Sequence, residues 1–226
     1  MIPPLIVRET KERGINLIAI TDHNATANII AVQKAAVGTG LVVLPGMELQ
    51  TREEVHALCL FDSLEQVDQW QQIVDGLLPP IENQPDHFGE QFVVDETGDF
   101  IRREPRLLIT SANISIDDAL ARVTALGGLL IPAHIDRRAF GLIAMLGFIP
   151  LDLPLEALEL SRHITPEEAM RKFPQCASYP LLLGGDAHRL DEFIGANQFE
   201  LSAPTIAEIR LALRQQDGRT FKINPS

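Results

Sequence analysis

Cysteine, aromatic and basic residues are all scarce in this 226-residue sequence. The two cysteines, Cys59 and Cys176, lie far apart and form no CxxC motif. This excludes a disulfide scaffold and is typical of a reducing compartment, so we expect a cytoplasmic protein. Lys and Arg total 19 against 31 Asp and Glu, for a formal net charge of -12. Because duplex nucleic acid is held chiefly by Lys and Arg contacts to phosphates, we expect no stable duplex binding.

Long hydrophobic runs are absent as well. No apolar stretch approaches the roughly 20 residues that a membrane-spanning helix needs, and the N-terminal segment lacks the basic region and apolar core of a signal peptide. We therefore expect no membrane partner. The composition, 46% hydrophobic and 22% charged, is that of an average globular protein. A chain of this length buries a substantial core, and we predict a single domain spanning 1–226.

Short apolar runs alternate with segments of helical pattern along most of the chain. Continuous apolar runs are typical of strands buried in a parallel sheet, and glycines close several of the helical segments. This alternation predicts the α/β class with a parallel sheet. The predicted strands are 17–21, 41–44, 54–61, 129–132, 157–160, 181–185 and 199–201. The predicted helices are 5–13, 25–37, 64–77, 116–126, 166–173 and 205–215.

The segment 78–106 interrupts the alternation. It is rich in proline, which breaks regular structure. Within it, residues 91–101 contain two apolar runs around a glycine turn, which is the pattern of a β-hairpin. We therefore predict that about 78–106 is a small inserted subdomain on one face of the domain.

Histidines and acidic residues recur where predicted strands end. In parallel α/β folds the carboxyl ends of the strands meet at one rim, where active sites are built. A single histidine at a strand end is more often structural than a ligand, so this prediction depends on the recurrence. Imidazole and carboxylate groups together are the ligands that Zn²⁺, Mn²⁺ and Fe ions take. The residues expected at the rim are His23, Glu48, His56, His134, Asp186 and His188.

Five short motifs follow one another across most of the chain. They are ITDHN at 20–24, PGME at 45–48, EVH at 54–56, PAH at 132–134 and GGDAH at 184–188. Each motif is weak alone, and together they resemble the PHP (polymerase and histidinol phosphatase) superfamily of metal-dependent phosphoesterases. The resemblance implies a distorted (β/α)7 TIM-like barrel with up to three divalent ions (Mn, Zn, Fe or Mg) at the carboxyl rim of its strands.

The resemblance also implies roles for the residues of the rim. All six match metal ligands of the family, and Glu48 is the carboxylate expected to bridge two ions. Asp22 is expected to orient a neighbouring ligand rather than to bind metal. His134, His188 and Asp186 are the expected catalytic residues, acting on protons beside a metal-activated water.

Two further residues are expected to contact substrate. Arg137 follows His134 at the same rim, and a guanidinium there is suited to hold a phosphate through two hydrogen bonds. The alternative for Arg137 is a solvated loop charge. His163 follows the predicted strand 157–160 and is a candidate for substrate binding, although a surface histidine has the same sequence pattern.

The sequence departs from the family at its start. PHP domains begin with a strand that carries an Asp-x-His-x-His motif, and no such motif precedes Pro3. We therefore expect a barrel that is missing its first strand and that holds fewer than three ions. Loss of a strand leaves two exposed strand edges, which are prone to association, so a homo-oligomer is a further expectation.

The leading functional hypothesis, from the resemblance, is a small stand-alone metal-dependent phosphoesterase. Its expected substrates are small phosphomonoesters, nucleotides or short oligonucleotides, because an acidic protein with a local cation cluster suits a small anion. The first alternative is a non-catalytic, truncated PHP module that binds metal or a partner. The second is another metal hydrolase, such as an amidohydrolase, which the absence of a candidate bridging lysine on a central strand disfavours.

Overall fold

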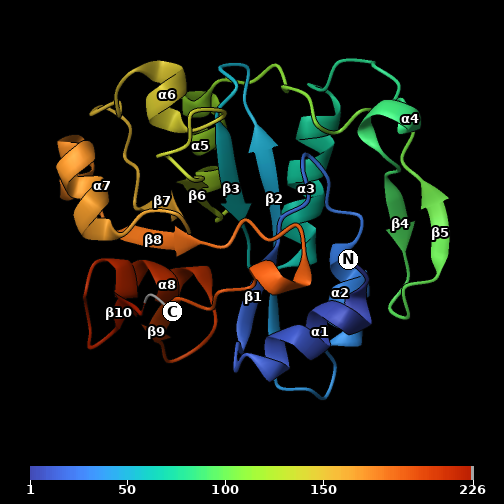
Figure 1. Cartoon of the computed structure of the whole chain (residues 1–226), viewed down its shortest axis with the longest axis horizontal. Coiled ribbons are helices and arrows are strands. Elements are labelled where there is room, and N and C mark those ends of the chain that lie inside the picture. Colours follow the sequence, from blue (N-terminus) through green and yellow to red (C-terminus); the bar gives the residue numbers. More distant parts are fainter. Residues whose placement is uncertain (225–226) are drawn as a thin grey trace.

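The computed structural model describes residues 1–224 as a mixed α/β fold (Figure 1). Its helices are α1 (Pro3–Glu12), α2 (Ile29–Ala35), α3 (Leu64–Asp75), α4 (Pro85–Phe88), α5 (Ile116–Ala125), α6 (Leu142–Leu146), α7 (Pro166–Lys172) and α8 (Ile206–Leu213). Its strands are β1 (Leu17–Ile20), β2 (Val42–Gln50), β3 (His56–Leu60), β4 (Phe92–Val94), β5 (Phe100–Arg103), β6 (Leu129–Pro132), β7 (Leu158–Ser161), β8 (Leu181–Gly184), β9 (Asn197–Glu200) and β10 (Thr220–Ile223). None of the helices within this range is long and apolar enough to span a membrane.

Four strands form the central sheet in the order β1-β2-β3-β6. β1 lies parallel to β2, whereas β3 runs antiparallel to both β2 and β6. The prediction of a parallel sheet is therefore wrong at β3. The connection 51–55 is too short for a parallel crossover, which needs a dozen or more residues, so the chain turns back as a hairpin. As a result His56, the first residue of β3, lies at the same sheet edge as the carboxyl ends of β1, β2 and β6.

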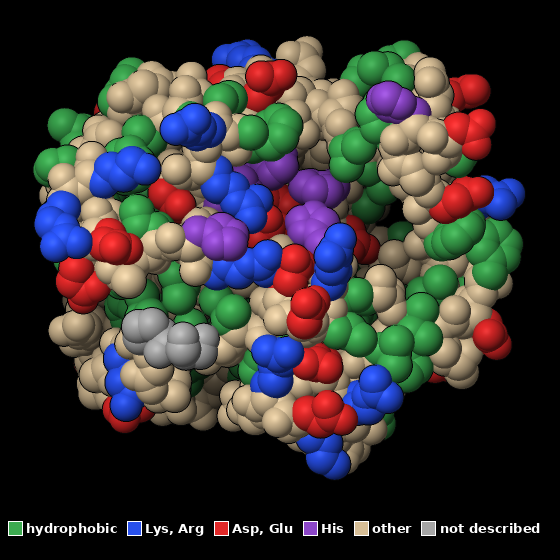
Figure 2. Space-filling view, viewed as in Figure 1, with side chains coloured by type: hydrophobic (Ala, Val, Ile, Leu, Met, Phe, Trp, Pro, Cys, Tyr) green, Lys and Arg blue, Asp and Glu red, His purple; other side chains and the backbone are tan. Residues whose placement is uncertain are grey.

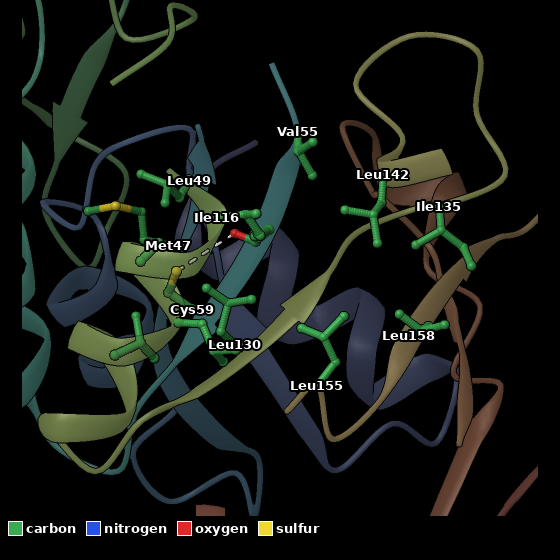
Figure 3. Close-up of a cluster of buried hydrophobic side chains, with 14 of the residues drawn as sticks. Met47, Leu49, Val55, Cys59, Ile116, Leu130, Ile135, Leu142, Leu155 and Leu158 are labelled. Carbon is green, nitrogen blue, oxygen red and sulfur yellow. Dashed lines mark hydrogen bonds between the residues drawn. The ribbon is translucent and has the colours of Figure 1, made fainter. Parts of the chain in front are cut away.

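Alternation along the strands divides their side chains between the two faces of the sheet. On one face Met47 and Cys59 belong to the largest core cluster, which α3 and α5 complete (Figure 3). On the other face Leu60 packs with α8 in a second cluster. Glu48 is adjacent to Met47, and His56 has the same parity as Leu60. Both therefore project from the second face, at the rim end of the sheet.

The remaining strands pair separately from the central sheet. β7 and β8 are parallel, whereas β4 with β5 and β9 with β10 are antiparallel. The described residues form no closed barrel, and the architecture established here is a mixed α/β fold. Within residues 1–224, β1 pairs only with β2, and β8 pairs only with β7. A cavity of about 1130 Å³ is lined by both of these strands, by the second face of the central sheet and, at one end, by His23 and Glu48.

The segment that interrupts the regular alternation contains α4 and the hairpin β4–β5, at the right of Figure 1. Asn28, just before α2, holds the hairpin: its side-chain amide donates to the Phe92 carbonyl at 3.1 Å and its oxygen accepts from the Val94 amide at 3.1 Å. Arg106 ties the end of the segment to α3 through Asp75 at 2.9 Å. The hairpin is therefore fastened to the main body beside the loop that carries His23.

Candidate metal centre

The Glu48 carboxylate is surrounded by three imidazole rings. Its Oε1 lies 3.1 Å from Nδ1 of His56 and 3.2 Å from Nε2 of His134, and its Oε2 lies 3.3 Å from Nδ1 of His23. Glu48 is 5% exposed, and His56 and His134 are buried. In Figure 2, histidine side chains gather near the centre of the visible face, among acidic and basic side chains. A carboxylate with several imidazoles is the donor set of a divalent transition metal.

The backbone places each ring at this edge of the sheet. His23 follows β1 and forms a parallel bridge with Glu48. His56 donates its amide to the Phe140 carbonyl at 2.9 Å, and the two rings stack with centroids 4.5 Å apart. His134 follows β6 with a left-handed φ of 33°. A positive φ is uncommon outside glycine and concentrates at functional sites, where the surrounding structure holds it.

The ionisation of the cluster depends on burial and on Glu48. Burial would raise the pKa of Glu48, but hydrogen bonds from His134 and His56 outweigh it and hold the pKa well below its usual range. Burial would lower the pKa of His134, yet the Glu48 contact leaves it raised. Burial lowers the pKa of His23 more than Glu48 raises it. At neutral pH the carboxylate is therefore ionised and His23 is neutral, as metal ligation requires.

Three ring nitrogens of the cluster, Nδ1 of His23, Nε2 of His56 and Nδ1 of His134, are buried and make no hydrogen bond of acceptable geometry within residues 1–224. Buried polar atoms are normally paired, so a group of unpaired ones indicates a missing partner. One donor atom each from His23, Glu48 and His56 lie within 4.8 Å of one another. The residues present therefore fit a divalent metal ion.

The other two predicted ligands form a neighbouring arm of the rim. Asp186 follows β8 with a left-handed φ of 43°, and its carboxylate forms an ion pair with Arg137. Nδ1 of His188 lies 3.4 Å from the same carboxylate. The His188 ring centroid is 6.0 Å from that of His23. The structure thus brings His23, His56 and His134 around Glu48, with Asp186 and His188 beside them. Of these two, Asp186 forms an ion pair with Arg137.

Two other predicted residues lie outside the cluster. His163 is exposed, and its backbone amide donates to the Ser161 hydroxyl at 3.3 Å. The Asp22 carboxylate accepts a hydrogen bond from Asn28 at 3.2 Å, and the Asp22 carbonyl accepts from the Glu48 amide at 3.2 Å. Asp22 therefore contacts a predicted ligand through its backbone.

Glu159, in β7, is a residue of the site that the sequence reasoning missed. Its carboxylate accepts a hydrogen bond from the His134 amide at 3.4 Å and lines the same cavity as Glu48. A Cβ atom at Gly184 would lie 2.2 Å from this carboxylate, so only glycine leaves room for it there. In the sequence, Glu159 is the single charged residue within the apolar run ALEL at 157–160. Because charged residues are rarely buried without a partner, this position indicates a residue of the site.

Glu159→Gln is expected to stabilise the metal-free protein at pH 8 and to have little effect at pH 5. Burial raises the folded-state pKa of Glu159 from its ordinary 4.5 to about 7. The stability that this shift contributes is fully present below pH 4.5 and is lost as the pH rises through 7, because ionisation is penalised only in the folded state. Allowing for partial solvent access, the difference at pH 8 is about 2 kcal/mol. Urea unfolding in EDTA at both pH values measures it, and an equal effect at the two would contradict the prediction.

No protein-family model matches the sequence, and no curated protein matches it. Solved structures do match. The lesion-specific endonuclease Q from Pyrococcus furiosus superposes with a TM-score of 0.67, at 20% identity over 100% of this chain and 55% of that one. A structure of endonuclease Q with a 27-mer duplex substrate that has an abasic lesion at its active site gives 0.65, at 20% identity over 97% and 53%. The chain therefore spans about half the length of these endonucleases.

A structure described as a metal-dependent phosphoesterase, from Bifidobacterium adolescentis, superposes with a TM-score of 0.55 at 21% identity, over 83% of this chain and 82% of that one. A two-domain protein from Bacteroides vulgatus, described as containing a PHP-like metal-dependent phosphoesterase, superposes with a TM-score of 0.51 at 12% identity over 99% of this chain and 61% of that one. At these identities the likeness shows a similar fold, and a fold shared with a PHP-like protein agrees with the predicted resemblance.

The prediction that this protein does not bind duplex nucleic acid stably is wrong, because net charge alone does not support it. Endonuclease Q has a similar fold and is seen with a duplex substrate at its active site. A formal charge of -12 averages over the whole surface, whereas the potential at a binding site is set by local side chains and bound cations. The net charge of this chain therefore excludes no class of nucleic acid.

Proposed function

We propose that this protein is a metal-dependent phosphoesterase whose metal centre is formed by His23, Glu48, His56 and His134. The observation that carries the proposal is the buried Glu48 carboxylate with three imidazole nitrogens 3.1 to 3.3 Å from its oxygens. The similarity of the fold to a metal-dependent phosphoesterase and to endonuclease Q supports the same reaction class. One of these two proteins is described as an endonuclease and the other as a metal-dependent phosphoesterase.

The roles of the residues follow from their positions. A divalent ion in this centre supplies a Lewis acid that activates water and neutralises a phosphate. Glu48 and the three imidazoles would hold it, and Asp186 and His188 would form a second arm. His134 and Asp186 would orient the attacking water, and the exposed His188 ring would deliver a proton to the leaving oxygen.

Arg137 and His163 are the proposed substrate contacts. The Arg137 guanidinium is half-buried at the same rim and faces Asp186. Its planar fork suits a phosphate once it is free of that carboxylate. His163 is exposed at the end of β7 and would reach only a substrate that extends away from the metal centre. We propose small phosphomonoesters, nucleotides and short oligonucleotides as substrates.

We also propose a finer architecture, a single PHP-like domain built as a TIM-like barrel that is open between β1 and β8. These two strands each pair on one side only, and the cavity of about 1130 Å³ lies along both. A further strand at this position would pair with both edges and complete the sheet. The segment 78–106 is then an insertion into this domain, fastened to it through Asn28 and Asp75.

The proposed activity predicts Mn²⁺-dependent hydrolysis of p-nitrophenyl phosphate or bis(p-nitrophenyl) phosphate, abolished by EDTA. His134→Ala is expected to lower the rate more than about 100-fold, because it removes a ligand that also contacts the Glu48 carboxylate. His87→Ala is the matched control, since His87 is exposed on α4 and its ring meets that of Phe88 edge to face. A p-nitroanilide substrate tests the amidohydrolase alternative.

Two results would contradict the phosphoesterase proposal. Turnover of the anilide without turnover of either phosphoester would favour an amidohydrolase. Binding of Mn²⁺ with no turnover of any substrate above the His134→Ala level would favour the non-catalytic module. Adding an oligonucleotide duplex with an abasic site to the assay then tells whether the substrate class includes lesion-containing nucleic acid.

A further inference from the structure

The Asp186 carboxylate has a positively charged partner, the Arg137 guanidinium. Its Oδ2 forms an ion pair with Nη1 of Arg137, and its Oδ1 lies 3.4 Å from Nδ1 of His188. The Asp186 side chain is 13% exposed and that of Arg137 is 35% exposed, so the pair is partly removed from water. Oδ2 therefore faces a guanidinium donor, whereas Nδ1 of His188 forms its hydrogen bond with the Asp186 main-chain carbonyl at 3.0 Å.

Asp186 differs in this respect from Glu48. The partners of Glu48 are imidazoles, which become metal ligands when they are neutral. A guanidinium keeps its proton under all ordinary conditions and offers no lone pair to a metal. A cation can therefore join the Glu48 cluster without displacing any side chain, whereas a cation at Asp186 must displace Arg137.

The backbone near each strand end holds this pair in position. Arg137 lies three residues after His134, and its amide donates to the His134 carbonyl at 2.9 Å in a tight turn. Asp186 lies two residues after the end of β8. Neither partner depends on a long mobile loop. Arg138, the next residue, is exposed and forms no hydrogen bond or ion pair within residues 1–224, so it offers a matched comparison.

We propose that Arg137 occupies the place of a second cation, so that this protein has one strong metal site at Glu48 and a weak one at Asp186 that fills only as Arg137 leaves. The inference deepens the proposed phosphoesterase function and depends on it. Displacement frees the guanidinium at the rim, where it can bind a phosphate. The second cation and an anion such as inorganic phosphate therefore favour each other's binding.

The test is a titration of metal-free protein with Mn²⁺, followed by the fraction of free ion in electron paramagnetic resonance. Wild type is expected to bind one ion tightly and a second only weakly. Arg137→Ala is expected to strengthen the second step about tenfold, as loss of a partly exposed ion pair at a ligand allows. Arg138→Ala removes the same charge from the next residue and is expected to leave both steps as in wild type.

Further variants separate competition at Asp186 from other causes. Asp186→Asn is expected to abolish the second step and keep the first, with or without Arg137→Ala. Arg137→Lys keeps the charge and the fold and should leave the second ion weak. Inorganic phosphate should strengthen the second step in wild type and have a smaller effect in Arg137→Ala.

The outcomes are distinguishable from failure of the proposed function. Suppose that wild type binds one ion tightly and that Arg137→Ala has the same affinity for the second ion as wild type. This result would overturn the inference but would support the metal centre at Glu48. If Arg138→Ala strengthened binding of the second ion as much as Arg137→Ala does, the inference would also be overturned. The cause would then be the loss of a positive charge rather than displacement of Arg137 from Asp186. No bound ion in any protein would overturn the inference together with the metal centre.

Discussion

Glu48→Gln is expected to reduce Mn²⁺ affinity and phosphoesterase activity by more than about 100-fold. Even a residue that only orients a ligand costs 10- to 100-fold when it is removed, and Glu48 is the single acidic group that all three imidazoles of the cluster contact. Glutamine keeps the shape of the side chain and removes its charge. The three imidazoles that remain cannot neutralise a divalent ion.

The same substitution changes the metal-free protein in a pH-dependent way. The pKa of Glu48 is depressed in the folded state, so its ionised form contributes stability above the unfolded value of 4.5, which is lost as the pH falls. Glu48→Gln should therefore destabilise the apoprotein at pH 7 and have less effect under acidic conditions.

Glu65→Gln is the matched control for Glu48→Gln, because Glu65 is exposed in the first turn of α3. Calorimetric titration with Mn²⁺ and urea unfolding in EDTA measure the two effects separately. If Glu48→Gln folds normally and binds Mn²⁺ as tightly as wild type, Glu48 is not a ligand of the metal centre.

The part of the site that could be predicted from sequence is the part fixed by strand ends. His23 and His134 each follow a short apolar run, and such runs are strands whose carboxyl ends share a rim. His56 reaches the same rim for another reason. It begins an antiparallel strand, and only the short connection 51–55 between two apolar runs indicates this. The apolar runs alone predict a parallel sheet, because a buried run has the same pattern in either strand direction.

Other features depend on contacts between residues far apart in the chain. The Arg137–Asp186 pair and the Glu159–His134 hydrogen bond join strand ends that no local pattern relates.

Local sequence patterns also fail to give the exact boundaries of some helices and strands. α2 begins at Ile29 rather than at residue 25, because Asn24 has a positive φ and its side chain bonds the Leu108 and Thr110 carbonyls. In contrast, β10 was missed although TFKI at 220–223 alternates polar and apolar residues as a half-buried strand does.

Trp70→Ala is expected to cost about 4 kcal/mol of unfolding free energy. Trp70, on α3, is 0% exposed and belongs to the core cluster that contains Met47 and Cys59. These two residues are a cross-strand pair of β2 and β3, and Met47 adjoins Glu48. The cavity left by a tryptophan costs about 3 to 5 kcal/mol, which is a large fraction of the stability of an ordinary domain.

Trp70→Phe keeps most of the buried volume and is expected to lose clearly less stability. Because Trp70 is the single tryptophan of the sequence, circular dichroism rather than fluorescence should follow urea unfolding of all three proteins.

Metal binding and core packing both stabilise the folded state. Mn²⁺ is therefore expected to restore part of the unfolding free energy that Trp70→Ala removes. A ligand that binds only the folded protein stabilises it by about 2.7 kcal/mol when its concentration is 100 times its dissociation constant. The folded variant is expected to keep the metal centre. The melting temperature of Trp70→Ala should therefore rise with Mn²⁺ by about as much as that of wild type. The rise should vanish in Trp70→Ala combined with Glu48→Gln. A metal-dependent rise in the double variant would show that Mn²⁺ binds elsewhere, and no rise in the single variant would show that α3 packing is needed to form the centre itself.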